Sequence, residues 1–130
     1  MADSLEMEPF NIIHNDSYIS KTVKIGKGCF IGQCNIIESE VVIGDFFICG
    51  YQNRIGHDSI IGDFCHVYVG ANIGGFNKIG NNVSICSSSC TKENVIIGDN
   101  SIIGLGSTVF RDVPSNYTTI GNPAKCIKIQ

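Results

Sequence analysis

A six-residue period runs through almost the whole chain and constrains its fold more than any other feature. Starting at Ile13, every sixth residue as far as Val109 is isoleucine or valine at fifteen of seventeen positions, with no insertion. The next residue is glycine ten times, and the residue four places after the aliphatic is small in every repeat except the one with Phe47. An α-helix repeats every 3.6 residues and a plain strand every two, so this period indicates a different fold.

Short β-branched segments separated by turns every six residues predict a coil with three faces, each built from a short parallel strand. Eighteen residues then complete one triangular turn, and each interior aliphatic stacks on another about 4.8 Å further along the axis. Seventeen hexads amount to about six coils. We expect the glycines and small residues at corners with little room and unusual dihedrals. An ordinary β-sandwich would need irregular strand lengths and hairpin signals, so the unbroken register argues against it.

The expected organisation is a single all-β domain with short extensions at both ends. Residues 1–12 carry three acids and are predicted to be a tail. Residues 13–114 form the predicted β-helix. The hexads stop after Val113-Pro114, and residues 115–130, with a turn signal at Gly121-Asn122-Pro123, are predicted to be a C-terminal cap. Such extensions often cover the open ends of a coil.

Composition argues against several functional classes. The 130 residues contain 9 Lys and Arg against 12 Asp and Glu, which supplies no basic face for nucleic acid. We expect no membrane contact, because the chain lacks a long apolar run and its first residues lack the pattern of an export signal, and we expect a cytoplasmic location. The seven cysteines form no C-x-x-C pair, so we expect reduced thiols, mostly core filler, and no metal.

Two histidines lie within the repeat in residues 55–70, IGHDSIIGDFCHVYVG. His57 holds the third place of its hexad, where the side chain should point outward, and Asp58 follows it. Gly75 comes 18 residues later and should lie one coil above His57. His66 is nine residues away, half a coil round the perimeter. The two histidines can therefore share a site only between neighbouring chains.

The stretch GHDSIIGDFCHVYVGANIGGFNKIG, together with GNPAKCIK near the C-terminus, resembles the β-helix domain of hexapeptide-repeat acetyltransferases. The resemblance is to the sialic acid O-acetyltransferases and the N-acetyltransferases of UDP-linked 4-amino-sugars, and it covers about residues 10–128. It implies a left-handed parallel β-helix. It also implies acetyl-CoA as co-substrate, a sugar or nucleotide-sugar acceptor, and a homotrimer with active sites between subunits.

Residue by residue, the same resemblance implies that His57 is the general base and Asp58 orients it. His66 would help to bind acetyl-CoA and the acceptor, and the Gly75 N–H would contact the acetyl carbonyl. An imidazole that titrates near neutral pH suits removal of a proton from an attacking amine or hydroxyl. We therefore expect direct transfer of acetyl to the acceptor. A preorganised N–H stabilises the developing oxyanion.

We expect CoA along the upper coils, with its pantetheine past Gly75 and residues 84–88. Its phosphates are then expected near three cations: Lys92, Arg111 and Lys125.

Two departures from the family pattern bear on this reading. Tyr68 and Cys86 replace the usual glycine at two stacked corners, where they can reshape the CoA groove or an interface. Family members also commonly carry an N-terminal nucleotide-binding half, and no such segment is found in this sequence. Either the β-helix alone holds the acceptor, or the chain is a fragment or a minimal relative.

The alternative functions are a non-catalytic trimeric scaffold and a γ-carbonic-anhydrase-like metalloprotein. The metalloprotein would need His14, His57 and His66 to converge on zinc at an interface.

Overall fold

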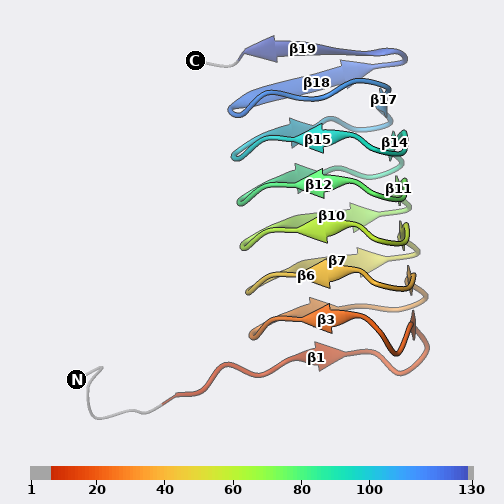
Figure 1. Ribbon diagram of the computed structural model, residues 1–130, viewed down its shortest axis with the longest axis vertical. Coiled ribbons are helices and arrows are strands. Elements are labelled where there is room, and N and C mark those ends of the chain that lie inside the picture. Colours follow the sequence, from red (N-terminus) through yellow and green to blue (C-terminus); the bar gives the residue numbers. More distant parts are fainter. Residues whose placement is uncertain (1–6, 129–130) are drawn as a thin grey trace.

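The structure, a computed structural model, describes residues 7–128. All secondary-structure elements in that range are β-strands. Residues 1–6 of the predicted tail lie outside the described residues. The strands stack as a triangular prism, with the N-terminal coil at one end and the C-terminal hairpin at the other (Figure 1). None of the described residues belongs to a helix with the length and apolarity needed to cross a membrane.

Three sheets form the faces of the prism, and we call them faces A, B and C. Face A contains β1 (Ile12–Ile13), β4 (Phe30–Ile31), β7 (Ile48–Tyr51), β10 (His66–Val69), β13 (Ser84–Ile85), β16 (Ile102–Ile103), β18 (Tyr117–Gly121) and β19 (Ala124–Lys128). Face B contains β2 (Tyr18–Ile19), β5 (Ile36–Ile37), β8 (Arg54–Ile55), β11 (Asn72–Ile73), β14 (Cys90–Thr91) and β17 (Thr108–Val109). Face C contains β3 (Lys24–Ile25), β6 (Val42–Ile43), β9 (Ile60–Ile61), β12 (Lys78–Ile79) and β15 (Ile96–Ile97).

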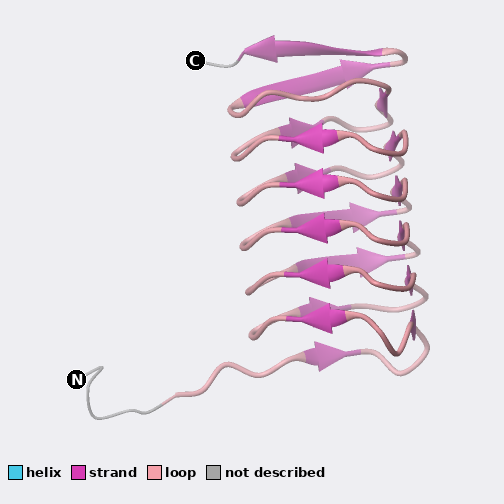
Figure 2. Ribbon diagram, viewed as in Figure 1, coloured by secondary structure: helices cyan, strands magenta, loops and turns pink. Residues whose placement is uncertain are grey.

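The strand register confirms the predicted parallel β-helix of about six coils. Ile13 pairs with Ile31, and Ile55 pairs with Ile73, so neighbouring strands are 18 residues apart. The strands of one coil alternate with turns, as Figure 2 shows. Two consecutive strand residues place one side chain inside and one outside, which explains why only every sixth residue must be aliphatic.

The interior follows the two inward positions of the hexad. Aliphatic residues such as Ile55 and Ile73 are fully buried, and Phe47 is accommodated inside as well. The second inward position includes buried polar residues, and Asn53 is an example: its side chain accepts from Ala71 N–H and donates to the Tyr68 carbonyl, both at 2.8 Å. These bonds join successive coils and satisfy polar groups that would otherwise be buried without partners.

The corner glycines correct one expectation. The glycine after each aliphatic does not have unusual dihedrals. The left-handed conformation falls two residues later, on residues such as Asp58 (φ 60°) and Asn94 (φ 60°). The glycine is needed because coils approach closely: a Cβ on Gly62 would lie 2.7 Å from the carbonyl oxygen of Gly80. Lack of room is thus the reason for the glycine, as expected, and backbone freedom is not.

The C-terminal residues fold back as a hairpin over the last coil. β18 runs parallel to β16 and continues face A, and β19 then returns antiparallel to β18. The hairpin turn lies at Gly121-Asn122-Pro123, where the sequence predicts a turn, and the Asn122–Pro123 bond is cis. This hairpin places Lys125 near the end of the prism, close to residues that follow β17.

Candidate functional site

His57 lies on the corner between faces B and C, directly after β8. Its Nδ1 is 3.0 Å from Oδ2 of Asp58, and both side chains are about half-buried. The ring edge packs against Phe76, with the ring centroids 5.1 Å apart and the planes at 88°. When Asp58 accepts a hydrogen bond from Nδ1, the lone pair for a proton from a substrate is on Nε2. Two contacts thus orient the imidazole.

The backbone N–H of His57 is held by the carboxylate of Glu38, which was not among the site residues predicted from the sequence. Oε1 of Glu38 accepts the His57 N–H at 2.9 Å, and Oε2 forms an ion pair with Arg54 at 2.8 Å. Arg54 also donates to the side chain of Asn72 at 3.3 Å. A signal was present in the sequence, because Glu38 follows Ile37 at the hexad position that is usually glycine.

Gly75 lies one coil above His57 and packs against its imidazole. A Cβ added at Gly75 would be 3.0 Å from both Cε1 and Nε2 of the His57 ring. Gly75 is buried, and within residues 7–128 its N–H has no hydrogen-bond acceptor, although its carbonyl accepts from Asn94 N–H at 3.0 Å. Buried N–H groups are almost always paired, so an unpaired one beside an imidazole indicates a position for an external acceptor.

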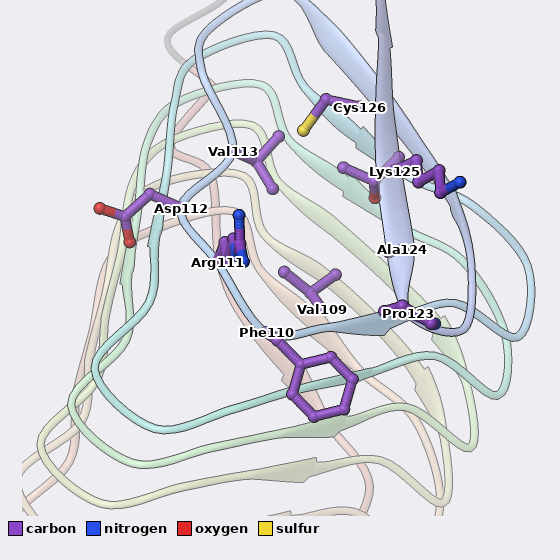
Figure 3. Close-up of a pocket in the computed structure, with 10 residues that line it drawn as sticks. Val109, Phe110, Arg111, Asp112, Val113, Pro123, Ala124, Lys125 and Cys126 are labelled. Carbon is purple, nitrogen blue, oxygen red and sulfur yellow. The ribbon is translucent and has the colours of Figure 1, made fainter.

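Two of the predicted cations, Lys92 and Arg111, lie farther along the same corner. Lys92 is exposed and follows β14, and Arg111 stands three coils from His57, about 14 Å at one strand spacing per coil. Arg111 and Lys125 line one pocket at the end of the prism, which we call the C-terminal pocket (Figure 3). The two residues are distant in the sequence but line the same pocket, and in Figure 3 the side chain of Lys125 points away from Arg111.

The C-terminal pocket has a volume of about 420 Å³. In Figure 3 the residues that follow β17 lie along one side, and Pro123 to Cys126 of the hairpin lie along the other. The lining residues are Val109, Phe110, Arg111, Asp112, Val113, Thr119, Pro123, Ala124, Lys125 and Cys126. Thr119 is 1% exposed, and its Oγ1 is the one buried side-chain oxygen or nitrogen without a hydrogen-bond partner in the described part of the chain. The pocket thus has a mainly apolar lining, with the charged residues Arg111, Asp112 and Lys125 around it.

His66 lies elsewhere, on β10 of face A. Its ring stacks on Tyr68, with centroids 3.8 Å apart and planes at 16°. Desolvation lowers the pKa of His66, which favours the neutral imidazole. Within one chain His57 and His66 are on different sides of the prism, as the spacing of nine residues predicts. Tyr68, one of the departures from glycine, is therefore a direct neighbour of His66.

The buried cysteines offer no activated nucleophile. All seven are free, and Cys29, Cys49 and Cys65 are buried in the core. Burial raises the pKa of Cys49 to about 12 and also raises the pKa of Cys65. Such thiols stay protonated at neutral pH, which agrees with their interpretation as core filler. Among residues 7–128 no three His, Cys, Asp or Glu side chains are grouped so that they could hold a metal ion.

Comparison with curated proteins found acetyltransferases, whereas no family model matched the chain. A serine acetyltransferase of Synechococcus elongatus is 35% identical over 114 residues, which is 80% of this chain and 39% of the relative. The GDP-perosamine N-acetyltransferase of Escherichia coli O157:H7 is 35% identical over 127 residues, 94% of this chain and 58% of the relative. The chain thus spans between about two fifths and three fifths of the length of these two relatives.

Solved structures with the same fold are also acetyltransferases. PerB from Caulobacter crescentus, in complex with CoA and GDP-perosamine, superposes with a TM-score of 0.90 at 28% identity and covers 92% of this chain and 58% of that one. The acetyltransferase domain of PglB from Neisseria gonorrhoeae, in complex with acetyl coenzyme A, gives 0.89 at 26% identity, covering 97% and 62%. Such superposition requires the same hand of coiling. The left-handed β-helix and the resemblance to hexapeptide-repeat sugar acetyltransferases are therefore confirmed.

Proposed function

We propose that this chain, as a relative of the β-helix domains of acetyltransferases, transfers the acetyl group of acetyl-CoA to an amino or hydroxyl group of a sugar or nucleotide-sugar. The observation that carries the proposal is the pairing of an oriented imidazole, His57, with the unpaired N–H of Gly75 in the next coil. A base and an oxyanion donor in adjacent coils of one corner are the two groups that acyl transfer needs.

In this reaction the acceptor nitrogen or oxygen attacks the thioester carbonyl carbon, and Nε2 of His57 takes the acceptor proton. The carbonyl oxygen becomes an oxyanion and accepts a hydrogen bond from Gly75 N–H. The C–S bond then breaks, and the imidazolium returns a proton to the leaving thiolate of CoA. Asp58 stabilises the imidazolium through Nδ1. Each proton is accounted for without a covalent enzyme intermediate.

The proposed place of CoA is the corner that leads from His57 to the C-terminal pocket. Its pantetheine would pass Gly75, and its phosphates would meet Arg111 and Lys125, with Lys92 nearer the middle. The extended arm of CoA can span three coils. Two cations that line a pocket with an apolar floor suit an adenosine phosphate.

The proposed assembly is a homotrimer in which His57 of one chain faces His66 of the next. Support comes from the separation of the two histidines within one chain and from apolar side chains exposed on face A, such as Ile48 and Ile102. The neutral form that desolvation favours at His66 suits hydrogen bonding to a substrate.

The test is release of free CoA thiol from acetyl-CoA with a panel of UDP-linked amino-sugars. We expect His57→Ala to lower kcat by about 10²- to 10⁴-fold, because the proton no longer has an acceptor, and to leave CoA binding in place. Lys27→Ala is the matched control, because Lys27 is exposed at the same hexad position as His57 but on the corner between faces C and A. Undiminished release in His57→Ala would contradict the role of His57, and absence of CoA binding in the wild type would favour the scaffold.

A further inference from the structure

We propose that a second pocket, near the N-terminal end of face A, binds a neutral sugar ring of the acceptor that is not the ring being acetylated. The pocket has a volume of about 260 Å³, and we call it the aromatic pocket after Phe30 and Tyr51. His14, Gly32 and Gln33 also line it. The inference rests on the proposed function for the position of the reacting group, and it narrows the acceptor to a glycoside of two or more rings.

Two exposed aromatic rings supply the stacking surface. Phe30 is 40% exposed and Tyr51 is 48% exposed. The Tyr51 ring packs against the backbone of Gly32, since a Cβ at that glycine would lie 3.1 Å from two of the ring carbons. This contact restrains the ring while leaving much of it accessible. Aromatic faces with this exposure pack against the C–H face of a pyranose ring.

Polar groups at the edge of the pocket suit sugar hydroxyls. His14 Nδ1 is 2.7 Å from Asp16 Oδ1, and His14 Nε2 is 3.2 Å from Gln33 Nε2. If Nδ1–H donates to Asp16, then Nε2 accepts from the Gln33 amide, and Gln33 Oε1 has no partner within residues 7–128. A hydroxyl can donate to this oxygen. A few polar groups beside an aromatic wall are typical of carbohydrate sites.

The charge around the pocket favours a neutral ring over a nucleoside diphosphate. Within the described chain, none of the turns that connect face A to face B contains a Lys or Arg. Asp16, in the first of these turns, places a carboxylate beside His14. Phosphate recognition normally uses cations or free backbone N–H groups. Here Gly32 N–H is already donated to the Cys49 carbonyl at 2.8 Å.

The position of the pocket relates it to the proposed reaction centre. Phe30 pairs with Ile48, and Ile48 pairs with His66, so Phe30 lies two strand spacings, about 10 Å, below His66 on face A. Gly32 and Gly50 stack beneath Tyr68, which contacts the ring of His66. An oligosaccharide that extends along face A over these two coils would place one ring in the pocket and another at the site.

The experiment is saturation-transfer NMR on the full chain with maltotriose, methyl glucoside, UDP-glucose and UDP. We expect transfer from aromatic protons to the trisaccharide, and a dissociation constant about three- to tenfold higher in Tyr51→Ala. Gln33→Ala should weaken binding without removing the stacking surface. Phe64→Ala is the matched control, because Phe64 is an exposed aromatic on a different corner.

Two results would overturn the proposal: transfer to the uracil ring of UDP without transfer to the trisaccharide, or saccharide binding that Tyr51→Ala and Gln33→Ala leave unchanged. CoA binding is measured separately by calorimetry. If the protein does not bind CoA but binds the saccharide in a Tyr51-dependent way, the acetyltransferase proposal is refuted and the sugar site is supported. If it binds CoA and releases thiol but does not bind the saccharide, the sugar site is refuted and the acetyltransferase proposal is supported.

Discussion

Gly75 and His57 lie one coil apart on one corner, and the space between them leaves no room for a side chain at position 75. A Cβ there would lie 3.0 Å from the imidazole. Gly75 does not have the left-handed conformation, so its backbone permits alanine. We expect Gly75→Ala to displace the His57 ring and lower kcat about 10²-fold, with little loss of stability. Steady-state kinetics and the imidazole NMR signals of His57 measure this.

Lys27→Ala is the control for that prediction, since Lys27 is exposed at the same hexad position as Gly75 but on the corner between faces C and A. An unchanged kcat in Gly75→Ala, together with an unmoved His57 signal, would contradict the proposed geometry.

The free energy of unfolding should depend on pH through His66. Desolvation lowers its pKa in the folded protein, whereas an unfolded histidine titrates near 6.5. As pH falls through and below that value, the unfolded chain binds more protons at this residue than the folded chain does. The free energy of unfolding should therefore decrease with acidification and rise with pH in this window.

The variant His66→Gln should flatten that dependence. Urea unfolding at pH 7.5 and pH 5 measures the change in free energy for both proteins. An equal change in His66→Gln and wild type would show that His66 does not contribute it.

At the scale of the strand and turn, close approach of coils decides which residue a corner accepts. A Cβ on Gly62 would lie 2.7 Å from the Gly80 carbonyl oxygen in the next coil. We expect Gly62→Ala to lower the free energy of unfolding by about 1–3 kcal/mol through overpacking. Chemical denaturation monitored by circular dichroism measures the loss.

Gly106→Asn is the matched control for Gly62→Ala. Gly106 has φ 65° and no atom within 4 Å of an added Cβ, and Asn94 and Asn100 hold the same turn position with φ 60°. Asparagine tolerates this conformation, so the change should stay within about 0.5 kcal/mol. A larger loss at Gly106 than at Gly62 would contradict the steric explanation for the corner glycines.

At the scale of the whole molecule, the separation of His57 and His66 makes the assembly testable. If each site takes His57 from one chain and His66 from the next, His57→Ala and His66→Ala trimers should each be impaired. Mixing and reassembling the two variants in equal amounts should restore about a quarter of the sites, because random association pairs the intact histidines at that frequency.

Thiol release after reassembly, with the mass measured by light scattering, reports both properties. A site formed within one chain would gain nothing from mixing, and a monomeric mass would rule out the shared site.

Much of the fold was predictable because a period of six assigns every residue to one face of the prism and to one position along its axis. The buried positions of Ile55 and Ser59, the outward side of His57 and the stacking of Gly75 on His57 all follow from counting. The dihedral argument for the corner glycines was wrong, since the period places glycine at a crowded point and does not report which residue bends the chain.

The candidate site was predictable in part. His57, Asp58 and Gly75 lie together as expected, but Glu38 was missed. Its carboxylate acts from the coil below through the His57 backbone, and the hexad pattern marks that position only as a departure from glycine. Cations at Lys92, Arg111 and Lys125 were expected along the CoA path, yet only the last two line one pocket.

The coil, its register, its interior and the column that holds His57 could all be predicted from the amino-acid pattern, because a strict repeat converts chain position directly into position in space. Three features became visible only in the folded chain: the unpaired Gly75 N–H, the bracing of His57 by Glu38 and Arg54, and the pocket that Arg111 and Lys125 both line. These features depend on side-chain reach and on where the chain folds back after its last hexad, and a periodic pattern carries no information about either.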